Sequence, residues 1–177
     1  EKIIFMPKIW NCHSGIEIER TFNESPFLKN NTITFGSFNN FSKINTPVIE
    51  TWSRILKEVK NSKLILKSSL PRVTDLLSDK FQNQGVLDSI EFITTLPNFE
   101  DHMLLYKKID IALDTFPYNA GTTASDALKM GLPILTLKGN SFNSREAANI
   151  ISAVNLPEMI TASQEEYEFL AIELAKN

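Results

Sequence analysis

The sequence predicts an α/β protein with a doubly wound, mainly parallel, Rossmann-like sheet and helices on both faces. The first observation is that short apolar or β-branched segments alternate with segments whose apolar residues recur at helical spacing. The second is the length of those helical segments, about ten residues or more, which is typical of βαβ units. Right-handed crossovers then assemble the strands into one sheet.

Five strands are expected. They are residues 32–39, 63–67, 89–94, 109–113 and 133–137. The first is rich in β-branched and aromatic residues, and the fourth is apolar enough for a strand that is buried on both faces. If the strand order is 3-2-1-4-5, the first and fourth strands flank the point where the order reverses.

Six helices are expected. They span residues 47–59, 73–84, 98–108, 122–130, 144–154 and 164–176. Pro47 suits the first turn of its helix, and Gly85 suits the position just after a helix end. Residues 1–30, which include Pro7 and Trp10, do not follow the alternation. We therefore expect an irregular lead-in over residues 1–30 and a Rossmann-like domain over residues 31–177.

The composition argues against several functional classes. The 177 residues carry 18 Lys and Arg against 21 Asp and Glu, a net charge of −3 without a basic run, so nucleic acid is not an expected partner. No apolar run approaches the roughly 20 residues of a membrane-spanning helix, so no membrane partner is expected either. The single cysteine, Cys12, excludes an internal disulfide and favours a reducing, cytoplasmic location.

The conspicuous polar residues follow the carboxyl ends of three expected strands. They are Asn39, Asn40 and Lys43, then Pro97, Asn98 and His102, then Asp114, Tyr118, Asn119 and residues 121–126. These strand ends meet at the edge where open α/β sheets bind ligands. Gly121, Thr122 and Thr123 lead into a helix, which places free N–H groups, hydroxyls and a positive dipole end together, as phosphate binding requires. We expect Lys43 to face this helix start.

Each of these residues also has a plainer interpretation. Thr123 and Asp126 fit a capping box with Asp in place of Glu or Gln. Lys43 fits a solvated loop lysine, and His102 fits a surface or capping residue. Asp114 could bond only the backbone amides of the following turn. The convergence of three loops on one edge favours a binding site.

Signatures of other sites are missing from the sequence. The segment FGSFNNF, residues 35–41, lacks the glycines of a dinucleotide site, and neither a P-loop nor a GxSxG motif is present. Two distant histidines, one cysteine and no acidic triplet make no metal-ligand set, so no metal is expected.

Four motifs in order resemble the C-terminal half of SPINDLY-type O-GlcNAc transferases, glycosyltransferase family 41. They are FGSFNNFSKI at 35–44, DIALDTFPYN at 110–119, TTASDAL at 122–128 and GLP at 131–133. Ser144, Arg145 and the segment 165–167 also match. The resemblance implies a GT-B enzyme whose two Rossmann-like halves enclose a UDP-sugar, with residues 31–177 as the nucleotide-sugar-binding domain and the lead-in coming from a missing upstream half.

The resemblance also implies roles for individual residues. Lys43, the expected catalytic residue, is implied to contact the diphosphate. Thr122 and Thr123 are implied to bind the diphosphate from the helix start, and Asp126 to bind the ribose. Asn40 lies beside the phosphates and His102 packs on the uracil. The full set of expected donor-binding residues is Asn40, Lys43, Leu96, His102, Gly121, Thr122, Thr123 and Asp126. Three residues depart from the family pattern: Gly121 stands where relatives often carry His, and Leu105 and Phe99 occupy positions that can be basic.

The expected function is transfer of N-acetylglucosamine from UDP-GlcNAc to Ser or Thr hydroxyls of proteins, with inversion and without a metal or other cofactor. The expected partners are the UDP-sugar, a protein acceptor, the upstream GT-B half and tetratricopeptide (TPR) repeats. Two alternatives stay open, a non-catalytic interaction domain of a repeat protein and a GT-B sugar-nucleotide enzyme such as an epimerase.

Overall fold

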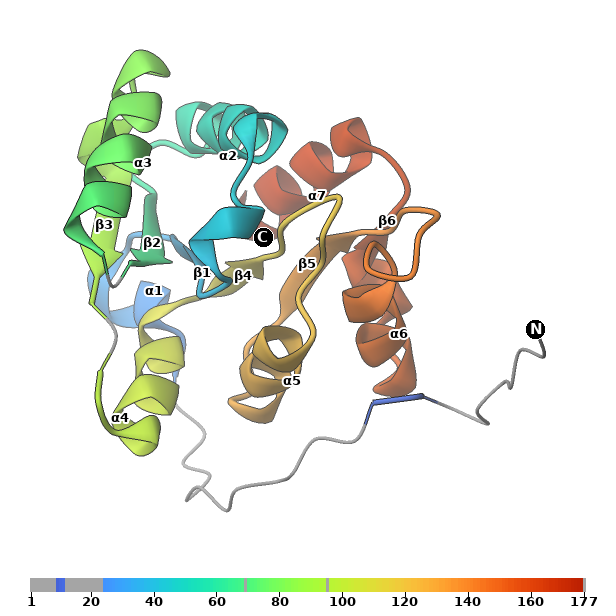
Figure 1. The fold of residues 1–177 in the computed structure, drawn as a ribbon. Helices are drawn as coiled ribbons and strands as arrows, with labels where there is room; N and C mark the ends of the chain where they lie inside the picture. Colours follow the sequence, from blue (N-terminus) through green and yellow to red (C-terminus); the bar gives the residue numbers. More distant parts are fainter. Residues whose placement is uncertain (1–8, 12–23, 69, 95, 177) are drawn as a thin grey trace.

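The computed structural model describes residues 9–11, 24–68, 70–94 and 96–176, and it contains one parallel sheet. The sheet has the order β3-β2-β1-β4-β5-β6 (Figure 1). Its strands are β1 (Thr34–Ser37), β2 (Lys63–Lys67), β3 (Ile90–Ile93), β4 (Ile111–Leu113), β5 (Ile134–Leu137) and β6 (Ile160–Thr161). Every neighbouring pair is parallel, which confirms the predicted fold class.

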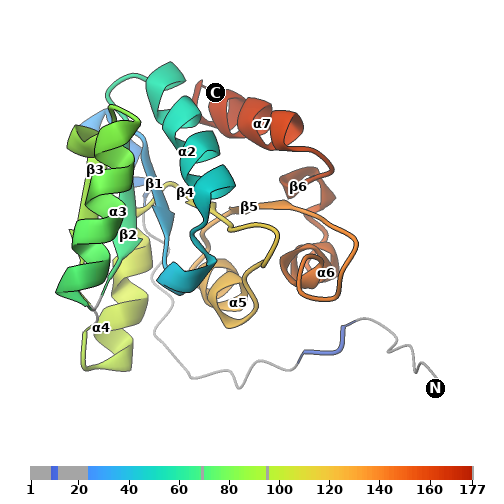
Figure 2. The same ribbon diagram turned by 45° about the horizontal axis from the view of Figure 1, so that its top comes forward.

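Helices cover both faces of this sheet. They are α1 (Pro26–Asn30), α2 (Thr46–Glu58), α3 (Pro71–Asn83), α4 (Phe99–Leu104), α5 (Thr122–Lys129), α6 (Glu146–Ala153) and α7 (Gln164–Lys176). Short 3-10 helices occur at η1 (Phe41–Lys43), η2 (Leu87–Ser89), η3 (Leu105–Lys108) and η4 (Pro157–Met159). Figure 2 shows α2, α3 and α7 on one face and α4, α5 and α6 on the other.

The strand residues divide between two cores because side chains alternate along a strand. Leu64 and Leu66 of β2 pack in the core under α2, α3 and α7, whereas Ile65 packs in the core under α4, α5 and α6. Trp52 and Phe81, both fully buried, belong to the first core. Helices cover both faces of the sheet, which explains why the strand segments predicted from the sequence consist mainly of apolar residues.

The predicted strand order 3-2-1-4-5 is confirmed, with β6 added at the edge beyond β5. Two residues of strand leave no periodicity in a sequence, so β6 was not predicted. The expected helix 98–108 divides into α4 and η3. Gly85 has a φ of +72°, as a residue after a helix end requires.

Within the expected lead-in, Pro26–Asn30 forms the short helix α1. The Asp110 carboxylate anchors it, accepting from the Ser25 hydroxyl, from the Phe27 N–H at 3.0 Å and from the Thr34 N–H of β1 at 2.8 Å. Pro7 and Cys12 lie outside the described residues. The division into residues 1–30 and 31–177 stays a prediction.

A buried chain of hydrogen bonds joins α2, α7 and the end of β4. The Trp52 indole N–H donates to the Tyr167 hydroxyl at 3.3 Å, and that hydroxyl donates to the Asp114 carbonyl at 2.9 Å. Phe116 packs edge-on against the Tyr167 ring, with the ring centroids 5.5 Å apart. The loop after β4 therefore rests on the C-terminal helix. None of the described helices combines the length and hydropathy that a membrane crossing needs.

Replacement of Tyr167 by Phe is expected to destabilise the fold. It leaves the Asp114 carbonyl and the Trp52 N–H buried without their partner, at a cost of about 1–3 kcal/mol in the free energy of unfolding. The matched control is Tyr106→Phe, since the buried Tyr106 hydroxyl has no partner among the described residues. Urea denaturation should show a loss for Tyr167→Phe and none for Tyr106→Phe; equal losses would contradict this account.

Candidate functional site

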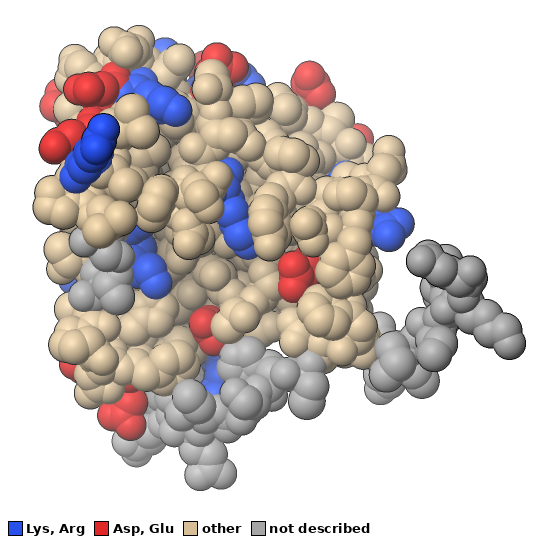
Figure 3. Space-filling model, in the orientation of Figure 1, with Lys and Arg blue, Asp and Glu red and all other residues tan. Residues whose placement is uncertain are grey.

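The candidate site lies beyond the carboxyl ends of β1 and β4, the neighbouring strands at which the strand order reverses. Two loops meet there, residues 38–45 after β1 and residues 114–121 after β4. Figure 3 shows basic and acidic side chains near the middle of this face, surrounded by uncharged surface. The topology thus brings the predicted residues of both loops together.

Asp114 organises the loop after β4. Its carboxylate is fully buried and accepts from the Ala120 N–H at 2.7 Å and the Thr115 N–H at 2.8 Å. The Thr136 hydroxyl of β5 donates at 2.6 Å, and the Asn39 side-chain amide donates at 3.3 Å. The bonds to the backbone amides of the turn are therefore confirmed, but they are not the whole role of Asp114, since the carboxylate also links the loop to Asn39 after β1 and to Thr136 of β5.

Burial raises the pKa of Asp114 to about 7, against a usual value of 3.8. The hydrogen bonds from Thr136, Ala120 and Thr115 and the positive charge of Lys43 act in the opposite direction. Burial has the larger effect because ionisation of a fully buried carboxyl group creates a negative charge where water cannot solvate it.

Lys43 points at the loop that opens α5. Its ammonium donates to the Asn119 carbonyl at 2.8 Å and lies 4.0 Å from the centroid of the Tyr118 ring. Burial lowers the pKa of Lys43, while the charges of Asp114 and Glu146 act against that decrease. Lys43 is half-buried, so the interpretation as a solvated loop lysine is wrong, and the expected approach to the helix start is confirmed.

The start of α5 leaves backbone donors free for a ligand. Gly121 is the N-cap residue, and no side chain caps the helix. The Ala124 and Ser125 N–H groups both donate to the Gly121 carbonyl, whereas the N–H groups of Thr122 and Thr123 precede the first helical acceptor. The capping-box interpretation is wrong, because the helix begins at Thr122 and so Asp126 stands too far along it.

Glu146 is a site residue that the sequence analysis missed. A Cβ built on Gly121 would overlap the Glu146 carboxylate, with Cδ at 2.7 Å. The carboxylate therefore occupies the space that a side chain at position 121 would need. The one signal in the sequence was its place directly after the matching Ser144 and Arg145.

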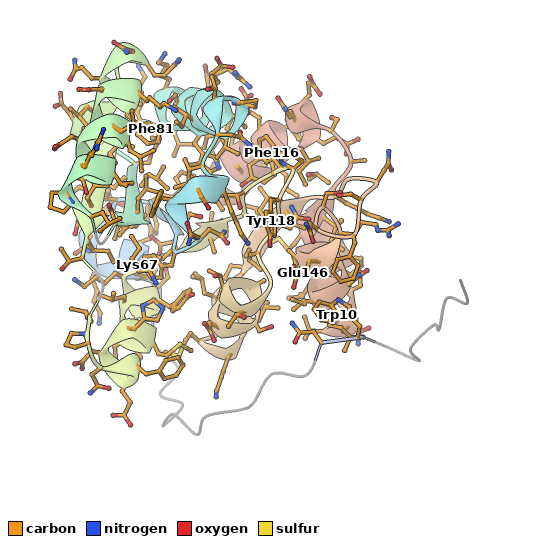
Figure 4. The ribbon with its side chains drawn as sticks, viewed as in Figure 1. Trp10, Lys67, Phe81, Phe116, Tyr118 and Glu146 are labelled. Atoms are coloured by element: carbon orange, nitrogen blue, oxygen red, sulfur yellow. The ribbon has the colours of Figure 1, made fainter. Side chains whose placement is uncertain are left out.

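A second group of residues lies between α4, α5 and the end of β2. The His102 ring lies 5.8 Å from Phe38 and 5.8 Å from Tyr106, measured between ring centroids. Burial lowers the pKa of His102, the charge of Lys67 lowers it further, and the charge of Asp126 opposes both. Burial also lowers the pKa of Lys67, again against Asp126. Figure 4 shows Lys67 above α4, and Glu146 and Tyr118 on the α6 side.

The other predicted site residues have structural roles in the ligand-free chain. The Asn40 side chain caps η1 by accepting from the Ser42 N–H at 3.0 Å. Leu96 is half-buried against the core under α4, α5 and α6. Phe99 is exposed beside His102, with ring centroids 6.5 Å apart, whereas Leu105 is buried in the core. Their roles toward a nucleotide stay predictions.

A cavity of about 690 Å³ borders the site on the β5 side. It is lined by Phe116 and Pro117 of the loop, by the residues after β5 and by the start of α7. Its size falls in the range of small-molecule sites. In the described part of the chain, no three His, Cys, Asp or Glu side chains gather as a metal-binding set.

The buried Asp114 carboxyl makes a pH dependence testable. Its pKa is higher in the folded than in the unfolded state, so its contribution to stability is complete below about pH 4 and is lost as the pH rises through about 7. Between about pH 5 and about pH 8 the expected loss is about 2–3 kcal/mol. Asp114→Asn does not titrate, so urea denaturation should show a smaller pH dependence for this variant; identical pH profiles would contradict the assignment.

Comparison with known proteins adds an independent observation. Residues 16–177 match the family model of glycosyl transferase family 41. The whole chain is 32% identical to a probable UDP-N-acetylglucosamine–peptide N-acetylglucosaminyltransferase SPINDLY of Eustoma exaltatum subsp. russellianum and covers 20% of it. The identity to the SEC protein of Arabidopsis thaliana, which carries the same enzyme description, is 32% over 85% of this chain and 16% of that protein.

Solved structures agree with this relationship. A mutant form of the Thermobaculum terrenum O-GlcNAc transferase has a TM-score of 0.78 and 32% identity over 82% of this chain and 28% of that chain. WaaG, a glycosyltransferase involved in lipopolysaccharide biosynthesis, has a TM-score of 0.61 and 18% identity over 86% of this chain and 41% of that one, which shows the fold alone. The chain thus spans about a fifth of the length of its SPINDLY relative. Together, the family match, the identity and the parallel sheet show that this chain belongs to glycosyl transferase family 41 and has the fold of the C-terminal half of a GT-B enzyme.

Proposed function

We propose that this chain is the donor-binding half of a glycosyltransferase that moves N-acetylglucosamine from UDP-GlcNAc to Ser or Thr hydroxyls of proteins. The observation that carries the proposal is the Lys43 ammonium, which lies 2.8 Å from the Asn119 carbonyl, two residues before the open start of α5. Because the chain spans about a fifth of its relatives, the complete activity belongs to a longer protein.

The chemistry requires positive charge at the leaving group. When the acceptor oxygen attacks the anomeric carbon, the bond from that carbon to the β-phosphate oxygen breaks, and UDP keeps the electron pair. The Lys43 ammonium and the free N–H groups of Thr122 and Thr123 can stabilise that charge. Groups of this kind support the proposal of metal independence. Inversion is proposed because a single displacement at the anomeric carbon inverts its configuration.

The nucleoside end of the donor suits the group around His102. Since burial and the charge of Lys67 lower its pKa, the imidazole is neutral near pH 7 and offers an uncharged ring for stacking on the uracil. The buried Asp126 carboxylate can accept hydrogen bonds from ribose hydroxyls. Leu96 and Asn40 complete the proposed contacts to the donor.

Two further partners are proposed from the GT-B fold and from the resemblance to the family. A second Rossmann-like half is proposed to close over the donor, and tetratricopeptide repeats to hold the protein acceptor. A cytoplasmic location is proposed because cytoplasmic enzymes are poor in structural disulfides and this chain has one cysteine.

One observation favours a second candidate, a non-catalytic interaction domain that keeps the fold. The Glu146 carboxylate lies against Gly121, at the point where the donor phosphate is proposed to bind. A longer protein that binds UDP but transfers no sugar to any acceptor supports this second candidate.

Replacement of Lys43 by Met is expected to weaken UDP binding by about 10- to 100-fold, because a charge-assisted contact to phosphate is worth about 1.5–3 kcal/mol. Isothermal titration measures the dissociation constant. The matched control is Lys63→Met, which removes an exposed lysine at the amino end of β2, on the opposite edge of the sheet.

Amide resonances give the position of binding in the same titration. UDP should shift the resonances of residues 121–126 in the unmodified chain. Absence of any shift there at millimolar UDP, or an equal loss of affinity in both lysine variants, contradicts the proposed site.

The 177-residue chain alone is expected to transfer no sugar. One half of a two-domain site cannot enclose donor and acceptor, so water would not be excluded from the reacting atoms. Incubation of the chain with UDP-GlcNAc and a Ser/Thr-containing peptide, followed by mass spectrometry, tests this. Measurable transfer would show that the upstream half is not needed.

A further inference from the structure

We propose that Glu146 is a specificity-determining residue that makes the site bind the product UDP less tightly than the sugar nucleotide. This inference rests on the proposed function, since it assigns Glu146 to the diphosphate end of that site. Its basis is a carboxylate that lies against the backbone where α5 begins, close to Lys43, which points at the same loop.

The position of the carboxylate is set by two helix starts. Glu146 is the first residue of α6, and its carboxylate lies against Gly121, the N-cap of α5. The overlap with a Cβ at position 121 means that this arrangement needs glycine there. The absence of a side chain at Gly121 therefore leaves the space that the Glu146 carboxylate occupies.

The negative charge of Glu146 acts on the site rather than on a structural partner. Its charge acts on Lys43, whose pKa it raises against the effect of burial. Among the residues that the structure describes, no hydrogen bond or ion pair of the Glu146 carboxylate is seen. A diphosphate bound to Lys43 and the α5 amides would thus meet one opposing negative charge that no hydrogen bond among the described residues holds elsewhere.

The two ligands of the proposed reaction differ in charge at this point. The terminal phosphate of UDP, joined to the α-phosphate by an anhydride bond, has two ionisable oxygens and, like a phosphomonoester, carries about −1.5 to −2 charges near pH 7. In UDP-GlcNAc the same phosphate is esterified to the sugar and carries a single negative charge. Because Coulomb repulsion grows with the product of the charges, Glu146 disfavours UDP more than the donor. The physical consequence is faster product release.

The plainer role of Glu146 is to stabilise α6, as acidic residues in a first turn do. That role predicts a loss of stability when the charge is removed, with no difference between ligands. The proposed role predicts a change that depends on the β-phosphate. Three ligands separate the two roles: UMP, which has no β-phosphate, UDP and UDP-GlcNAc.

The experiment compares the dissociation constants of these three ligands for the unmodified chain and for Glu146→Gln. We expect Glu146→Gln to bind UDP about tenfold more tightly, UDP-GlcNAc about threefold more tightly, and UMP with less than a twofold change. Glu146→Ala removes the same charge and provides a second variant if the first does not fold. The control is Glu158→Gln, an exposed acid of η4.

Each outcome decides between the claims. Unchanged UDP affinity in the Glu146 variants, or an equal change for all three ligands, overturns this inference and leaves the proposed function standing. If the unmodified chain binds none of the three ligands at millimolar concentration, the proposed function fails and the inference fails with it. A gain for UDP in Glu158→Gln as large as in Glu146→Gln assigns the effect to net charge and also overturns it.

Discussion

The rest of the site depends on the burial of one carboxylate, that of Asp114. It accepts hydrogen bonds from Asn39 after β1, from Thr136 of β5 and from two amides of its own loop. A carboxylate without these donors would be too costly to bury at this position. The loop that carries Tyr118 and Asn119 is therefore fixed relative to three adjacent strands, and the backbone carbonyl that holds Lys43 in place belongs to that loop. The position of Lys43 at the proposed site thus depends on the hydrogen bonds of a buried carboxylate.

The sheet could be predicted from sequence because its information is local and periodic. Apolar segments such as residues 63–67 are covered on both faces, so their composition alone identifies buried strands. The general rules for βαβ units gave a parallel sheet with right-handed crossovers. The strand order 3-2-1-4-5 was an assumption in the sequence analysis, and the structure has this order with β6 added. The element that was missed, β6, has two residues and is held by its pairing with β5. The pairing with β5 determines the extended conformation of such a short strand, and the residues of the strand itself carry no pattern that predicts it.

The site could be predicted in part, for a related reason. Lys43, His102 and the start of α5 were expected together because strand ends of a parallel sheet share one edge. The structure brings Lys43 to the loop before α5, whereas His102 lies in a second group beside Phe38. The partners of Asp114 and the position of Glu146 depend on which side chains face each other across different elements. Tyr167 reaches Asp114 from a helix 53 residues later in the chain, and no periodic pattern reports such a contact. Capping was misassigned at Thr123 because several residues near a helix start fit the same local motif.

The pair Gly121 and Glu146 shows how a departure from the family pattern acquires a physical meaning. The resemblance to the family leads us to expect histidine at position 121, and a glycine there would remove one of the proposed contacts to the phosphates. In the structure the Glu146 carboxylate of α6 occupies the space that a side chain at position 121 would need. A negative charge therefore lies where a protonated histidine at position 121 would place a positive one. Lys43 then has acidic neighbours on two sides, the buried Asp114 and the half-buried Glu146. The charges of Asp114 and Glu146 thus act against the burial that lowers the pKa of Lys43. For the proposed diphosphate, one cation and the amides that open α5 would act against one opposing acid.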